Sequence, residues 1–218
     1  MNEREIHSAI RILRREVPKW DTPVVTLMAE TYESPFRVLI SCILSLRTQD
    51  ATTAKASHRL FAVADSPEAM VKLTAKKIEK LIYPVGFYRT KARQIRALSA
   101  ILLSRHGGRV PDTIEELLML PGVGRKTANL TVTLGFGKPG ICVDTHVHRI
   151  ANRLGWVATK APDDTEAALR LRLPKRWWIP INETLVRHGQ QVCKPISPLC
   201  SACPVERACP KIGVDRRR

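Results

Sequence analysis

Apolar residues recur at helical spacing along most of the chain. The first stripe begins at Ile6 and stops before Pro18, a residue that ends helices. Residues 36–46 are apolar on nearly all sides, which predicts a helix buried at the centre of a bundle. Strand-like alternation is not sustained, so the pattern predicts an all-α protein. Further amphipathic stripes predict helices over residues 91–103, 145–154, 165–173 and 181–190.

Capping residues indicate where several of these helices begin and end. Ser66 followed by Pro67 is typical of a helix start, because serine caps the first turn and proline fits its first position. Asp112 and Thr113, with glutamates three residues later, mark another start. The glycine pair after His106 marks a helix end.

A short turn with two glycines separates two of the apolar runs. It consists of Pro121, Gly122, Val123 and Gly124, and Arg125 follows it. A glycine turn that leads into a helix leaves the first N–H groups of that helix exposed, where they can bind a phosphate. Such a helix-hairpin-helix can hold DNA without reading its sequence. Because many binding modules contain this hairpin, it does not by itself establish an enzyme.

Two side chains near the hairpin can supply chemistry. Lys126 lies in the first turn of the second helix, and its amine can form a Schiff base with a carbonyl-type carbon. The alternative for Lys126 is a solvated phosphate contact. Asp144, at the start of the next predicted helix, can take a proton or stabilise a developing cation. Alternatively, it only caps that helix. The ordered combination of both residues with the hairpin favours an enzyme.

The charge of the chain indicates a polyanionic partner. Lysine and arginine number 36 against 20 aspartates and glutamates, a net charge of +16. Nucleic acid fits this excess better than a membrane surface, because no basic amphipathic anchor or lipidation motif is evident. No apolar run approaches the ~20 residues of a membrane span, and the N-terminus lacks the features of a signal peptide. We therefore expect a cytoplasmic protein, associated with the nucleoid if the source is prokaryotic. We also expect a monomer, because DNA would occupy the basic face.

Six cysteines in a reducing compartment favour a metal site over disulfides. Cys42 and Cys142 lie in apolar surroundings and are predicted to be core residues. The array of the other four can hold one zinc ion or one cubane iron–sulfur cluster. Its wide first gap and single Cys-x2-Cys favour [4Fe–4S]. The array, Cys-x6-Cys-x2-Cys-x5-Cys, consists of Cys193, Cys200, Cys203 and Cys209.

These motifs resemble the endonuclease III family of helix-hairpin-helix DNA glycosylases. The resemblance extends from about residue 34 to the last cysteine of the array, and its carriers besides that array are residues 86–92, 120–128 and 143–149. It implies two helical domains with the active site in a cleft between them. The implied six-helix barrel domain spans residues 28–138. The implied iron–sulfur cluster domain combines residues 1–27 and 139–218.

The resemblance also implies an activity. Lys126 matches the family's nucleophile, which attacks C1′ of a flipped nucleotide, expels the base and cuts the strand by β-elimination. Asp144 matches the catalytic carboxylate. The implied partner is double-stranded DNA with a damaged base or an abasic site, and oxidised pyrimidines are the family's usual substrates. An amine at position 126 indicates a bifunctional glycosylase and lyase, because the adenine-mismatch branch lacks it.

Four further residues are assigned to DNA by the same resemblance. Phe87 matches an apolar wedge that enters the base stack, and its alternative is a buried aromatic at a helix start. Arg47 stands where the bacterial pattern has the glutamine that fills the gap left by the flipped base. Either Arg47 takes over that role with its planar guanidinium, or Gln49 does so from a shifted register. Lys194 lies on a loop that the cluster would stiffen against the DNA backbone.

The main alternative is a non-catalytic helix-hairpin-helix DNA-binding protein with a structural metal cluster. The combination of Lys126 with Asp144 argues against it, because holding a phosphate needs no acid. An iron–sulfur electron carrier fits less well, since such a carrier has little use for the hairpin or for the net charge of +16.

Overall fold

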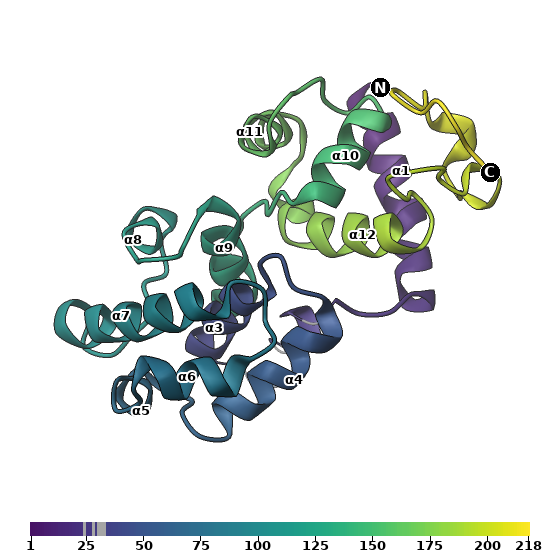
Figure 1. The fold of residues 1–218 in the computed structure, drawn as a ribbon. Helices are drawn as coiled ribbons and strands as arrows, with labels where there is room; N and C mark the ends of the chain where they lie inside the picture. The colour runs from purple at the N-terminus through teal and green to yellow at the C-terminus, as the bar shows by residue number, and fades with distance from the viewer. Residues whose placement is uncertain (24, 28, 30–33) are drawn as a thin grey trace. The chain divides into compact units, whose positions relative to one another are not determined.

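The computed structural model describes residues 1–23, 25–27, 29 and 34–218, which form helices and turns with no strand among them (Figure 1). The all-α prediction is therefore confirmed. These residues divide into a split unit, Met1–Pro23 with Pro139–Arg218, and a hairpin unit, Val24–Lys138. The domain boundary predicted at residue 28 falls outside the described residues.

The hairpin unit is built around α3 (Pro35–Ser45). Every residue from Val38 to Leu44 is buried, which confirms the predicted central helix. Helices α4, α7 and α9 pack on it, and α7 also packs on α5 and α6, which Figure 1 shows side by side. The other elements are α4 (Asp50–Phe61), α5 (Pro67–Val71), α6 (Ala75–Ile82), α7 (Tyr88–His106), α8 (Ile114–Leu118), α9 (Arg125–Leu130) and the π-helical η2 (Thr131–Gly135).

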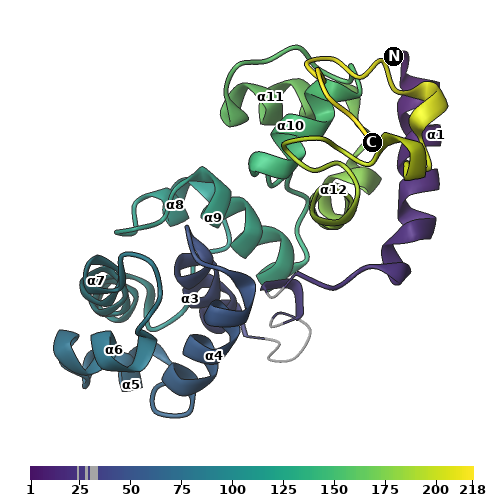
Figure 2. The ribbon, with the colours of Figure 1, turned by 45° about the vertical axis from the view of Figure 1, so that its right-hand side comes forward.

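The split unit buries a second core that draws on both ends of the chain. Helix α12 (Trp178–Gln191) contacts α1 (Glu3–Glu16) and α10 (Thr145–Arg153), as Figure 2 shows. The apolar face of α1 thereby joins residues more than a hundred positions away, such as Leu185. The remaining elements are α11 (Pro162–Arg172) and the short helices η1 (Val17–Lys19), η3 (Lys175–Trp177), η4 (Cys200–Ala202) and η5 (Glu206–Ala208).

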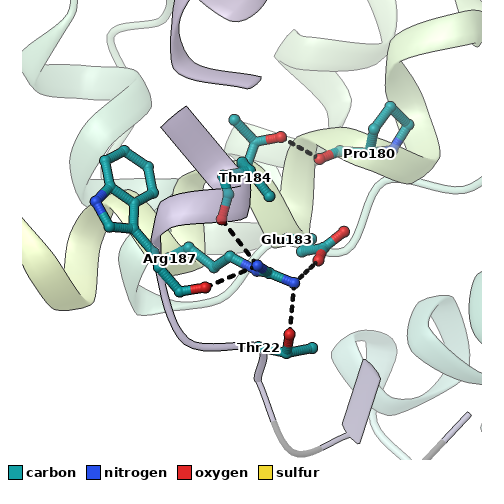
Figure 3. Close-up of polar contacts among 7 residues, drawn as sticks. Thr22, Pro180, Glu183, Thr184 and Arg187 are labelled. Carbon is teal, nitrogen blue, oxygen red and sulfur yellow. Dashed lines mark hydrogen bonds and ion pairs between the residues drawn. The ribbon is translucent and has the colours of Figure 1, made fainter. Parts of the chain in front are cut away.

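Arg187 of α12 fixes the segment that follows α1 (Figure 3). Its Nη1 donates hydrogen bonds to the carbonyl oxygens of Val17 and Trp20, both at 2.9 Å. Its Nη2 donates to Thr22 Oγ1 at 2.8 Å and pairs with the carboxylate of Glu183. Arg187 is buried, so folding removes its hydrogen bonds to water, and these bonds within the protein take their place.

Replacing Arg187 with methionine should lower the free energy of unfolding by about 2–4 kcal/mol, because two carbonyls and a carboxylate lose their charged donor. Urea denaturation of the purified protein measures this loss. The control is Lys19→Met, which removes an exposed pair with Glu16 and should cost less than about 1 kcal/mol. Equal losses in the two variants would contradict the anchoring role of Arg187.

Candidate active site

The predicted hairpin connects α8 to α9. Gly122 has a φ of +81°, and a Cβ there would lie 2.9 Å from the side chain of Gln94, so only glycine suits this position. Val123 is buried, and its N–H bonds to the carbonyl oxygen of Leu120 at 3.2 Å. Pro121 lies half-buried beside it. The turn is thus anchored in the core by one side chain and shaped by one glycine.

The start of α9 is open to its surroundings. Gly124 is the N-cap and brings no side chain, and a Cβ built there would have no neighbour within 4 Å. Gly124 and Arg125 are both exposed. The first N–H groups of a helix have no partner within the helix, and the helix dipole favours an anion at this end. This end of α9 can therefore receive a phosphate group.

Lys126 is the second residue of α9 and is half-buried. The buried thiol of Cys42 lies close enough to feel the charge of Lys126. Burial raises the pKa of Cys42 to about 12, and the positive charge of Lys126 opposes that rise. Cys42 is therefore a neutral thiol near neutral pH. Together with the buried Cys142, this confirms the prediction that both cysteines belong to the core.

Asp144 is the N-cap of α10. Its Oδ1 accepts hydrogen bonds from the N–H groups of His146 and Val147, each at 2.9 Å. The capping alternative is thus confirmed, but it does not remove the chemical one. The side chain is half-buried rather than enclosed, and two backbone donors hold the carboxylate in a fixed orientation. A carboxylate held in this way can also stabilise a cation.

Phe87 and Arg47 lie together on the surface of the hairpin unit. Phe87 is 62% exposed, so the alternative of a buried aromatic at the start of α7 is wrong. The guanidinium carbon of Arg47 lies 5.5 Å from the centroid of the Phe87 ring, within the range of a cation–π contact. Gln49 is exposed at the N-cap of α4 and makes no side-chain capping bond.

The four clustered cysteines line one cavity of the split unit. Within the described ranges, no three His, Cys, Asp or Glu side chains are placed to hold a single metal ion. A tetrahedral zinc site needs sulfur atoms about 3.8 Å apart, because each lies about 2.3 Å from the metal. Burial raises the pKa of Cys203 to about 11, so binding to a metal must displace its proton.

Two residues that the sequence did not reveal support this cavity. Arg153 of α10 is buried and donates to the carbonyl oxygens of Lys194 and Pro195, both at 2.7 Å. His188 is also buried, and its Nε2 lies 3.8 Å from Cys203 Sγ. Burial, reinforced by Arg149, lowers the pKa of His188 to about 4, so its ring is neutral near neutral pH. Lys194 itself is half-buried on the held loop.

Comparison with known proteins identifies the family. A model described as HhH-GPD superfamily base excision DNA repair protein matches residues 40–175. The chain is 53% identical over 175 residues to endonuclease III of Thermotoga maritima, a match that covers 80% of this chain and 82% of that protein. The chain belongs to the endonuclease III family. The match to the family model also confirms the predicted helix-hairpin-helix glycosylase fold.

Relatives of this endonuclease III family member include a mammalian protein and solved DNA complexes. It is 44% identical over 201 residues to endonuclease III-like protein 1 of Bos taurus, covering 87% of this chain and 66% of that protein. A trapped endonuclease III–DNA covalent intermediate, an estranged-adenine complex, has a TM-score of 0.87 at 33% identity and 97% coverage of both chains.

No helix in the described part of the chain is long and apolar enough to span a membrane.

Proposed function

We propose that this endonuclease III family member removes oxidised pyrimidines from duplex DNA through a Schiff base on Lys126 and cuts the strand by β-elimination. The class of activity follows from the family: the chain is a base excision repair DNA glycosylase with abasic-site lyase activity. The observation that carries the assignment of the nucleophile is the place of Lys126. It stands in the first turn of α9, two residues after the exposed N-cap Gly124.

In the proposed reaction the unprotonated Nζ of Lys126 attacks C1′ while the glycosidic bond breaks. The base leaves with the bonding electron pair and takes up a proton. Opening of the sugar at O4′ then leaves an iminium ion between C1′ and Nζ. Loss of a proton from C2′ expels the 3′ phosphate, and water finally releases the amine. The carboxylate of Asp144 stabilises the positive charge on the sugar as the base departs.

The proposed DNA partner is bound as a duplex by a single copy of the chain. The hairpin, residues 121–125, receives a backbone phosphate, and Lys194 supplies a further positive charge. Phe87 enters the stack as a wedge, while Arg47 or Gln49 fills the space of the flipped nucleotide. Flipping costs a few kcal/mol and least at a damaged pair, so the weakness of the lesion contributes to its selection.

We assign the cysteine cavity to a [4Fe–4S] cluster. Cys193, Cys200, Cys203 and Cys209 are its proposed ligands, and their arrangement around one cavity suits four thiolates on a cubane. The cluster supplies a rigid cross-link among these cysteines rather than a step of the reaction. Its proposed effect is to hold the loop that carries Lys194.

Cys203→Ser should give protein that has lost most of its iron and its visible absorption, because a hydroxyl replaces one of four thiolate ligands. Metal analysis of the wild type should find about four irons per chain and no zinc. The matched control is Cys42→Ala, which also removes a thiol but should keep the iron, since Cys42 lies in the other unit. Full iron content in Cys203→Ser would show that the ligand set is wrong.

Borohydride trapping tests the proposed function. The wild-type protein is incubated with a duplex that contains one thymine glycol, with a duplex that contains one abasic site, and with undamaged DNA. We expect a covalent complex with the first two and none with the third. Trapping on the abasic site alone would retain the lyase and reject the oxidised pyrimidine as substrate. No trapping on either would favour the non-catalytic DNA-binding protein.

A further inference from the structure

Two neighbouring turns of the hairpin unit hold unusual backbone conformations. Arg47 follows α3 with a φ of +52°, and Phe87 precedes α7 with a φ of +58°. Residues other than glycine rarely adopt this left-handed region, and such positions persist only where the surrounding structure enforces them. Both side chains are nevertheless exposed, and they contact each other.

The backbones of the two turns lie in direct contact. The N–H of Gly86 donates to Thr48 Oγ1 at 3.1 Å. A Cβ on Gly86 would lie 2.5 Å from the carbonyl oxygen of Arg47, so the approach requires glycine. The residue before Phe87 therefore packs against the residue that bears the guanidinium. The two turns are therefore coupled through a backbone contact and a hydrogen bond.

Lys91 lies beneath these turns and connects them. Its own N–H bonds to the carbonyl oxygen of Phe87 at 3.0 Å. Its Nζ donates to the carbonyl oxygens of Leu44 and Leu46, at 2.9 and 2.6 Å, and lies 3.3 Å from Thr48 Oγ1. An ammonium has three N–H donors, and three oxygens receive them. The side chain of Lys91 thus holds the turn at Arg47, and Thr48 Oγ1, which accepts from both Lys91 and Gly86, links it to the turn at Phe87.

Stability alone does not account for this lysine. Lys91 is only 5% exposed, and its bonded partners in the described residues are neutral oxygens rather than a carboxylate. Burial lowers the pKa of Lys91 to about 8, so folding disfavours its charge, although the residue stays protonated at neutral pH. Buried charges without a charged partner are costly and occur most often where function needs them.

We propose that Lys91 is a positioning residue that holds Arg47 and Phe87 in the arrangement in which they enter the DNA beside the lesion. The inference rests on the proposed function and deepens it, because it names the group that keeps the wedge rigid. A wedge must not yield when it separates stacked bases, so its backbone has to be fixed before DNA binds. Lys91 provides that fixation from inside the unit without touching DNA.

A double-mutant cycle tests this inference. Wild type, Lys91→Met, Phe87→Ala and the double variant are compared on a thymine glycol duplex with 2-aminopurine opposite the lesion, whose fluorescence reports unstacking. We expect Lys91→Met to reduce both the fluorescence rise and the rate of base release by about tenfold or more. In the Phe87→Ala background the same change should cost clearly less, about threefold, because only the effect on Arg47 remains and residues that act through one contact are not additive.

The control is Leu102→Ala, a core change in the same helix α7 that touches neither turn. It should lower the midpoint of thermal denaturation. It should keep the fluorescence rise, measured at a temperature at which all variants are folded. If Lys91→Met does not fold, Thr48→Val replaces it, since this change removes one acceptor of Lys91 and the bond from Gly86. Its expected effect is smaller and in the same direction.

The outcomes separate the two proposals. An active wild type with additive effects of Lys91→Met and Phe87→Ala would overturn the positioning role and leave the proposed function intact. A normal fluorescence rise in Lys91→Met would do the same. A wild type that neither releases a base nor forms a trapped complex would overturn the proposed function and this inference with it.

Discussion

Lys126→Ala is expected to abolish covalent trapping and to slow base release by at least about a thousandfold. The amine that becomes the Schiff base nitrogen is gone, and methyl cannot replace it. Binding to the same damaged duplex should stay within a few-fold of wild type, because only one of many positive charges is lost. Borohydride trapping and gel-shift titration on the same DNA measure the two quantities.

Arg125→Ala is the matched control for Lys126→Ala. It removes a positive charge from the adjacent, more exposed position of α9 and leaves the amine in place. This variant should bind DNA more weakly and lose affinity less steeply with added salt, yet still form the trapped complex. A trapped complex with Lys126→Ala would show that another amine is the nucleophile.

Asp144→Asn should separate the two roles of Asp144. Asparagine caps helices about as well as aspartate, and its amide oxygen can accept the same two backbone N–H groups. The free energy of unfolding should therefore fall by less than about 1 kcal/mol. This is the contribution of the attraction between a negative charge and the helix dipole, which asparagine lacks. Base release should nevertheless slow by about 10²–10⁴-fold, because the carboxylate charge is lost.

Asp144→Ala completes this comparison, since it removes the cap together with the charge. It should lose about 1 kcal/mol more stability than Asp144→Asn and be about equally slow. Thermal denaturation and single-turnover base release measure both variants. If Asp144→Asn keeps the wild-type rate, the side chain is a helix cap and nothing more.

The helices of this chain were predictable wherever burial follows an apolar pattern. Helix α3 is the clearest case, because its residues are apolar on nearly all sides and those from Val38 to Leu44 are all buried. Helix α4 was not predicted. Its buried face includes Thr53, Ala56 and Ser57, which are small or polar, so no apolar stripe marks it. Packing against α3 and α6, rather than its own pattern, establishes this helix.

The reactive residues of the site could be predicted from the sequence, but the residues that hold the site in place could not. Local motifs predicted the hairpin with its lysine and the N-cap at Asp144, because each depends on residues a few positions apart. The partners of Lys91 and Arg153 lie about 40 or more residues away in sequence. One sequence holds no signal for such pairs. The left-handed backbone at Phe87 was equally hidden, since it depends on contact with a distant turn.

A core shared by both ends of a chain affects how that chain is made. On α1, Leu13 leaves the ribosome about 170 residues before its core neighbour Leu185, a delay of roughly 10–30 s at typical rates of synthesis. The continuous hairpin unit can bury its core within that interval. During synthesis, the apolar face of α1 therefore stays accessible to chaperones and proteases for this time, while the unit that carries Lys126 can already be folded.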